Sequence, residues 1–288
     1  MYVITGVTGR VGGGVARHLL AQGHRVRAVV RSEAKGAAWK KLGCEVAVAS
    51  LADAPALTAA FSGADGVFLM SPPDFDPAVG FPDTLRNIES VAAAVDAAQP
   101  GKLVYLSTVG AHVERFSLLN NALLFERALR RLPIPVAFVR AAWFMENAAW
   151  DVGSAREGVI STFLQPFEHV IPMVATADIS ALAAQTLEQS WSGVRVIELE
   201  GPRRYSAADV AKGFAAVLGK PVRCEAVPRN SWEALFRSQG MQNPEPRIQM
   251  IDGFNAGWID FEGGDAEPHR GLTPLDAALR EVVLRAGQ

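Results

Sequence analysis

The sequence predicts an α/β fold, a Rossmann-type doubly wound parallel sheet with a smaller C-terminal α/β cap. Through the first half of the chain, short apolar runs alternate with helix-length amphipathic runs, and a glycine-rich turn joins the first strand to the first helix. After residue 145 the alternation becomes irregular and prolines interrupt it. We therefore expect a sheet domain over residues 1–145 and a smaller, discontinuous cap over residues 146–288.

Six apolar runs before residue 145 have the length and composition of buried parallel strands. They are residues 2–5, 26–30, 44–49, 66–70, 103–107 and 136–140. Apolar residues at helical spacing lie between them and predict helices ending at Gly23, Gly43 and Gly63, and further helices over 85–98 and 118–131. Six strands joined by helices match a doubly wound nucleotide-binding sheet.

The cap region is less regular. Residues 194–199 predict a buried strand that returns to the main sheet, and residues 207–218, 232–239 and 275–285 predict helices. We expect this smaller part to pack over the carboxyl edge of the sheet, because open parallel sheets bind their ligands at that edge.

The composition favours a soluble cytoplasmic protein. The 288 residues carry a formal charge of −2 and contain no run of Lys or Arg, so direct nucleic-acid binding is not expected. No apolar stretch approaches the ~20 residues of a membrane helix, and the first residues lack a basic signal region. Cys44 and Cys224 are expected to be reduced and buried, and the scattered histidines predict no metal site.

The most specific motif is Thr5-Gly6-Val7-Thr8-Gly9-Arg10-Val11-Gly12, between the first strand and the first helix. Gly6 permits a tight turn, Gly9 lets backbone amides approach a diphosphate, and Gly12 permits close contact between helix and strand. The helix N-terminus then offers unpaired N–H groups and a partial positive charge to the anion. The motif predicts dinucleotide binding, although the Gly13-Gly14 pair also allows a glycine-rich turn without ligand.

The end of the second strand predicts NADP(H) rather than NAD(H). An NAD enzyme places an acid there to accept a hydrogen bond from the ribose hydroxyl, whereas this chain has Arg31. A guanidinium suits a 2′-phosphate. Arg10 can join from the other side, with Lys35 as a more distant helper, and the competing interpretation is that Arg31 is a solvated strand end.

Several segments together resemble the NmrA-like family of atypical short-chain dehydrogenases. They are the glycine loop, the tip at Arg31, and the segments Leu103–Thr108, Pro133–Asn147 and Val174–Ile179. The similarity covers nearly the whole chain. The family contains NADPH-dependent quinone, azo-dye and triphenylmethane-dye reductases, and also a transcriptional co-regulator that binds the nicotinamide cofactor without evident turnover.

The resemblance also implies positions for the cofactor-binding residues. Met70-Ser71-Pro72 should lie along the cofactor, Ser107-Thr108 near the nicotinamide ribose, and Ala142-Trp143-Phe144 beside the nicotinamide or the substrate. One departure concerns the third strand, after which relatives often carry Gly-Asp facing adenine. This chain has Ser50-Leu51 there, and Ser50 supplies only a hydroxyl.

The proton relay of tyrosine-dependent dehydrogenases, Tyr-x-x-x-Lys, is missing. Tyrosines stand only at positions 2, 105 and 205, and the residues four positions later are Gly6, Val109 and Asp209. A simple ketone would yield a strongly basic alkoxide that needs such an acid. A quinone instead gives a phenolate-like product with a pKa of about 10, which water can protonate. If the protein is catalytic, a small delocalised aromatic electrophile is therefore the expected substrate.

Candidate polar groups for catalysis are His112, Asn120 and Asn121, and His112 could donate to a carbonyl oxygen. Each has a structural alternative, because His112 could be a surface loop residue and the asparagines could cap the helix over 118–131. Glu126 in that helix is expected to be structural or solvated. The rival function is an NADP(H)-sensing regulator that acts through a protein partner.

Overall fold

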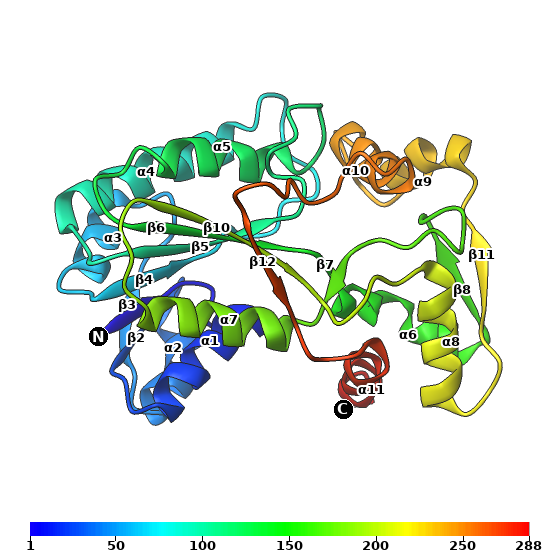
Figure 1. Ribbon diagram of the computed structural model, residues 1–288, viewed down its shortest axis with the longest axis horizontal. Coiled ribbons are helices and arrows are strands. Elements are labelled where there is room, and N and C mark those ends of the chain that lie inside the picture. Colours follow the sequence, from blue (N-terminus) through cyan, green and yellow to red (C-terminus); the bar gives the residue numbers. More distant parts are fainter. Residues whose placement is uncertain (288) are drawn as a thin grey trace.

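All eight strands of the main sheet run parallel in the computed structural model, which describes residues 1–287 (Figure 1). The strands are β1 (Tyr2–Ile4), β2 (Val26–Val30), β3 (Glu45–Val48), β4 (Gly66–Leu69), β5 (Leu103–Thr108), β6 (Val136–Ala141), β10 (Val194–Glu200) and β12 (Glu267–Arg270). Their order is β12-β10-β6-β5-β4-β1-β2-β3. The chain runs outward from β1 to β3 and then returns to the other side of β1 with β4. This reversal confirms the doubly wound topology and marks the edge where such sheets bind ligands.

Helices cover both faces of the sheet (Figure 1). One face carries α1 (Arg10–Ala21), α2 (Glu33–Lys41) and α7 (Thr176–Glu188), and the other carries α3 (Ala54–Phe61), α4 (Pro82–Ala98) and α5 (Asn120–Leu129). Because successive strand residues point to opposite faces, Ile4 packs into the first layer and Val3 into the second. Burial on both faces explains why these strands form nearly continuous apolar runs.

Helices α1 and α7 lie in close contact across a glycine. A Cβ added at Gly14 would lie 2.3 Å from Ser180 Oγ, which is far below a van der Waals distance. The Ser180 hydroxyl also contacts the Thr176 carbonyl oxygen at 2.7 Å and the Val11 carbonyl oxygen at 3.1 Å. The third glycine of Gly12-Gly13-Gly14 is therefore used for helix packing, beyond the needs of the phosphate loop.

The cap lies beyond the carboxyl edge of the sheet (Figure 1). Its elements are β7 (Trp143–Phe144), η1 (Met145–Asp151), α6 (Val152–Arg156), β8 (Val159–Thr162), β9 (Met173–Val174), α8 (Ala207–Leu218), β11 (Arg223–Ala226), η2 (Arg229–Ser231), α9 (Trp232–Ser238), α10 (Glu245–Asn255) and α11 (Leu275–Arg285). Strands β7 and β9 pair in parallel, as do β8 and β11. A separate apolar core, centred on Phe214, Trp232 and Phe236, holds the cap together.

The strands expected from the sequence are present within one or two residues of their predicted ends. Strand β10 returns to the sheet as expected and pairs with β6, where Ile197 lies opposite Val139. Helix α5 begins at Asn120 instead of residue 118. Cys44 is buried, but it precedes β3, and Cys224 is only half-buried, so the expectation of two buried thiols was wrong for Cys224.

Strand β12 and helices α7 and α10 were not predicted. Strand β12 is an edge strand of exposed residues, Glu267-Pro268-His269-Arg270, and pairs with β10 through Leu199 and His269. Such a strand has no apolar pattern because neither of its faces is buried. Within residues 1–287, the helices are all too short or too polar to span a bilayer.

Candidate active site

The glycine loop adopts a geometry that tolerates no side chain at two positions. Gly6 has φ of +65°, in the left-handed region, and a Cβ there would lie 2.4 Å from Met70 Sδ. A Cβ at Gly12 would lie 2.5 Å from the carbonyl oxygens of both Thr5 and Gly6. Gly9 is the N-cap of α1, where no side chain accepts a hydrogen bond and no acid occupies the first turn. The first-turn amides are thus free of any competing carboxylate, and the loop fits a diphosphate.

The end of β4 is fixed beside this loop. The Met70 amide donates to Thr5 Oγ1 at 3.0 Å, so the two strand ends are joined across the reversal point of the sheet. The next residue, Ser71, shares a hydrogen bond of 3.0 Å with the buried hydroxyl of Tyr105, and Pro72 is exposed. Burial raises the pKa of Tyr105 well above its ordinary value.

The tips of β2 and β3 carry the residues expected around the adenosine. Arg31 is exposed and makes no ion pair within residues 1–287, and Ser50 is exposed beside half-buried Leu51. Val30 lies opposite Val48 in the sheet register, so these two strand tips are neighbours. An unpaired guanidinium at this position fits the extra phosphate of NADP(H).

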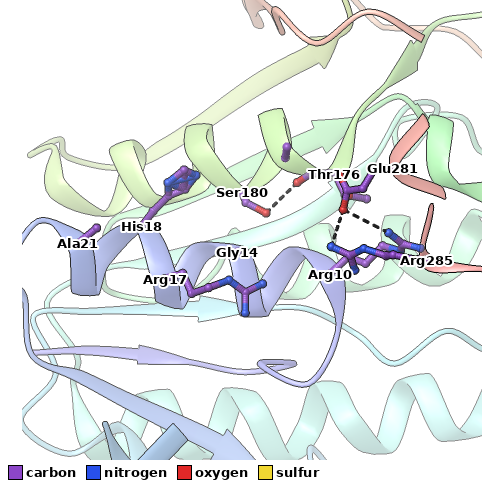
Figure 2. A pocket seen from close by; sticks show the side chains of 10 residues that line it. Arg10, Gly14, Arg17, His18, Ala21, Thr176, Ser180, Glu281 and Arg285 are labelled. Atoms are coloured by element: carbon purple, nitrogen blue, oxygen red, sulfur yellow. Dashed lines mark hydrogen bonds and ion pairs between the residues drawn. The ribbon is translucent and has the colours of Figure 1, made fainter. Parts of the chain in front are cut away.

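Arg10 is directed elsewhere. Figure 2 shows its guanidinium reaching toward Glu281 of α11, with the Nη1–Oε1 distance at 3.9 Å, and Arg285 pairs with the same carboxylate. The surrounding pocket has a volume of about 280 Å³ and lies along α1 and α7, where Arg17 and His18 also line it. In this structure the expected helper of Arg31 therefore contacts α11 instead.

Strands β5 and β6 supply the residues expected at the nicotinamide end. Thr108 lies opposite Ala141, and the Ala142 amide donates to the Leu199 carbonyl oxygen at 2.9 Å. Trp143 is half-buried, and its ring meets Phe254 of α10 edge to face with centroids 5.2 Å apart. Phe144 is also half-buried and packs against the sheet core. Trp143 is thus supported by the cap and Phe144 by the sheet.

A network of ion pairs around the buried Arg140 lies at the carboxyl ends of β5 and β6. Arg140, Glu126 and Glu198 are at most 6% exposed. Arg140 donates to Glu126 at 2.8 and 3.0 Å and to Glu262 at 2.5 Å. Burial opposes the charge of Arg140, but these carboxylates hold its pKa above the ordinary value. Ser107 Oγ donates to Glu126 Oε1 at 2.6 Å, so this hydroxyl points into the network.

The two asparagines expected in catalysis lie in different surroundings. Asn120 Oδ1 accepts from the Ser117 amide at 2.8 Å, and its Nδ2 donates to the carbonyl oxygens of Val113 and Arg115 at 3.3 Å each. Asn120 therefore holds the loop before α5, but it does not cap the helix, because no side chain caps the N-terminus of α5 at Leu119. Asn121 lines a pocket of about 320 Å³ that it shares with Ser71 and Pro72.

His112 is half-buried in the loop after β5. Its Nδ1 is buried and has no hydrogen-bond partner among the described residues. The carboxylates of Asp260 and Glu262, on the segment that follows α10, are hydrogen-bonded to Arg204 and Arg140. No hydrogen bond within residues 1–287 joins His112 to Asn120 or Asn121. The three candidates are therefore three separate groups in this structure.

Most of the chain matches one known protein family. Residues 2–257 match the NmrA-like family. The chain belongs to the NmrA-like family. The resemblance and the Rossmann-type fold expected from the sequence are thereby confirmed.

Relatives of this NmrA-like protein include reductases. It is 26% identical over 243 residues to NAD(P)H azoreductase of Xenophilus azovorans, covering 84% of this chain and 82% of that protein. It is 30% identical over 229 residues to (4-alkanoyl-5-oxo-2,5-dihydrofuran-3-yl)methyl phosphate reductase of Streptomyces griseus, covering 78% and 76%. The NADPH complex of a quinone oxidoreductase from Escherichia coli has the same fold, with a TM-score of 0.80 at 23% identity over 100% of both chains.

One feature of the NmrA-like protein was not predicted from the sequence, a connection between the sheet and the cap. We call residues 71–81, between β4 and α4, the strap. The Asp76 carboxylate in the strap accepts from the amides of Gln242 and Asn243 at 2.7 and 2.6 Å, in the loop between α9 and α10. Phe75 meets Trp150 of η1 edge to face, with centroids 5.9 Å apart. An aromatic residue in a proline-rich loop was the only available signal.

Proposed function

We propose that this NmrA-like protein is an NADPH-dependent reductase of a quinone-like or dye-like aromatic electrophile, acting without a Tyr-Lys proton relay. The observation that carries the proposal is the uncapped N-terminus of α1 behind Gly6 and Gly12, at the reversal point of the sheet. Its relatives named as azoreductase and quinone oxidoreductase support the reaction class. When bound, NADPH supplies the hydride, and the protein supplies binding and orientation.

Different residues of the chain bind different parts of the cofactor and the substrate. The first-turn amides of α1 hold the diphosphate, and Arg31 binds the 2′-phosphate as a guanidinium fork. Met70, Ser71 and Thr108 line the cofactor between these ends. Trp143 and the strap orient a flat substrate and exclude water from the site. Positioning of this kind lowers the barrier because two reactants are held in one geometry.

The proton chemistry supports a delocalised acceptor. Tyr105 is buried, hydrogen-bonded to Ser71, and has a raised pKa, so it is a poor acid. His112 is the remaining candidate donor near the site, since its Nδ1 has no partner within the described residues. A phenolate-like product with a pKa of about 10 needs no strong acid in the transition state.

The test follows oxidation of NADPH by its nicotinamide absorbance, with a benzoquinone, a naphthoquinone, an azo dye and an aliphatic ketone. We expect turnover of the aromatic acceptors and none of the ketone. A faster reaction with the ketone would contradict the proposal. If calorimetry detects NADPH binding but no acceptor is reduced, the regulatory function would replace the enzymatic one. The His112→Ala variant tests the donor, because unchanged turnover would remove His112 from the mechanism.

A further inference from the structure

Arg247, in the first turn of α10, has an unusual environment for a cation. It is half-buried and has no carboxylate partner within residues 1–287. The other arginines that lack an ion pair there are all exposed: Arg17, Arg31, Arg115, Arg131 and Arg156. Burial lowers the pKa of Arg247. A charge that is partly withdrawn from water and left unpaired is costly, and such sites are commonly functional.

The groups around Arg247 leave most of its donors unused. Its guanidinium lies 4.4 Å from the ring centroid of Phe236 and 5.6 Å from that of Phe75. Its one hydrogen bond within the described chain runs from Nη1 to Met241 Sδ at 3.7 Å. Aromatic faces attract the cation but accept no strong hydrogen bond, and a thioether is a weak acceptor. A guanidinium with five N–H donors therefore retains the capacity to bind an anion.

Asp76 of the strap forms no ion pair with Arg247 in the part of the chain that the structure describes. Asp76 lies in the strap directly after Phe75, but both oxygens of its carboxylate accept from the backbone amides of Gln242 and Asn243. These bonds hold the strap against the cap and fix the Phe75 ring over Arg247. The packing thus holds the guanidinium in place but leaves most of its N–H donors without acceptors.

Helix geometry relates Arg247 to the proposed substrate position. Phe254, which supports Trp143, lies seven residues after Arg247 on α10. Seven residues are nearly two turns, so both side chains leave the same face of the helix, about 10 Å apart along its axis. The strap borders this face of α10, because Phe75 contacts Arg247 and also meets Trp150 of η1. The separation of about 10 Å along α10 is comparable to the length of an aromatic molecule of two or three rings that carries a substituent.

We infer that Arg247 determines substrate specificity by binding an anionic substituent, a sulfonate, carboxylate or phosphate, on the aromatic substrate. This inference rests on the proposed function. A guanidinium binds such a group through two parallel hydrogen bonds, which gives both charge and direction. The same charge disfavours cationic dyes, because a like charge in a half-buried site is repelled. The site therefore selects acidic aromatic acceptors over neutral and cationic ones.

The test compares a naphthoquinone with its sulfonate under NADPH, for the wild type and for Arg247→Met and Arg247→Lys. We expect Arg247→Met to lower kcat/KM for the sulfonate by about 10- to 100-fold, as expected for loss of a charged hydrogen bond. The kcat/KM for the neutral quinone should change by less than about twofold, because this substrate has no anionic group for Arg247 to bind. Arg247→Lys should retain part of the preference, because it keeps the charge but not the fork. Arg115→Met, which removes an exposed cation stacked on Trp258, is the matched control and should change neither substrate.

A binding measurement separates failure of the inference from failure of the proposed function. Calorimetry with naphthalene sulfonate, which cannot be reduced, should show binding to the wild type and loss of binding in Arg247→Met. If the wild type oxidises NADPH with neither quinone, the proposed function fails while calorimetry still tests Arg247. If the neutral quinone is reduced but Arg247→Met leaves the sulfonate-to-neutral ratio and the sulfonate affinity unchanged, the inference is overturned. Arg247→Lys provides the same readouts if the methionine variant does not fold.

Discussion

Arg140 donates to both carboxylate oxygens of Glu126, from Nε to Oε1 at 3.0 Å and from Nη2 to Oε2 at 2.8 Å, and each side chain is 2% exposed. Arg140 lies in β6 and Glu126 in α5, so the pair ties a helix to the sheet. Ser107 of β5 donates to the same carboxylate. The ends of two strands that enter the candidate active site are therefore fixed by one buried acid.

Removal of either partner should be strongly destabilising. Glu126→Gln leaves the buried Arg140 without its bidentate partner, and Arg140→Met leaves the buried Glu126 with only the exposed Arg130, so each variant should cost about 3–5 kcal/mol in the free energy of unfolding. Urea denaturation followed by circular dichroism measures this. The exposed pair of Arg127 with Glu114 provides the control, and Arg127→Met should cost about 1 kcal/mol or less. Equal losses in the buried and exposed variants would contradict the structural role.

This pair also shows what the sequence could predict. Arg140 stands in an otherwise apolar strand, and Glu126 shares the buried face of α5 with Ala122, Phe125 and Leu129. A charge at an inward position requires a partner, so burial could be inferred, and Glu126 proved structural rather than solvated. The identity of the partner could not be inferred, because β6 and α5 meet only in three dimensions.

The strands and the glycine loop were predictable because their signals are local. Apolar runs of four to six residues and glycines at fixed offsets depend only on neighbouring positions. The strap and Arg247 depend on contacts between residues 75, 76 and 236–247, which nothing local encodes. The contact between Arg10 and Glu281 could not be inferred for the same reason, because Glu281 lies on the last helix.

Gly12 should be essential for both the fold of the loop and cofactor binding. In Gly12→Ala the new Cβ would lie 2.5 Å from two backbone oxygens, so the loop must shift. We expect the Kd for NADPH to rise more than about tenfold, since the amides at the start of α1 would move away from the diphosphate. Gly153→Ala is the control, because a Cβ there meets nothing within 4 Å. Unchanged NADPH affinity in Gly12→Ala, measured by calorimetry, would rule out this location of the diphosphate.

Asp151 in η1 should make stability depend on pH. Burial raises its pKa from 3.8 to about 6 in the folded protein. The folded state therefore binds more protons than the unfolded state between about pH 4 and pH 6, so the contribution of Asp151 to stability falls as the pH rises through that window. Above it the buried charge costs on the order of 1–3 kcal/mol. Asp151→Asn removes this charge.

The variant should raise the Tm at about pH 8 and change it much less at about pH 4, where Asp151 is protonated and uncharged in the folded protein. Thermal melts at both pH values measure the difference. A gain of equal size at both pH values would show that the substitution acts through packing rather than through the charge.

Arg31 should determine the preference for NADPH over NADH. It is exposed at the tip of β2 and forms no ion pair within residues 1–287, so its guanidinium is free for a 2′-phosphate. Arg31→Met should raise the Kd for NADPH about tenfold or more and leave the Kd for NADH unchanged, because only NADPH carries that group. The same titration with Arg10→Met distinguishes the two arginines, and a larger loss of NADPH affinity there would move the specificity contact to the α11 side of the loop. Tighter binding of NADH than of NADPH by the wild type would exclude a 2′-phosphate site at Arg31 altogether.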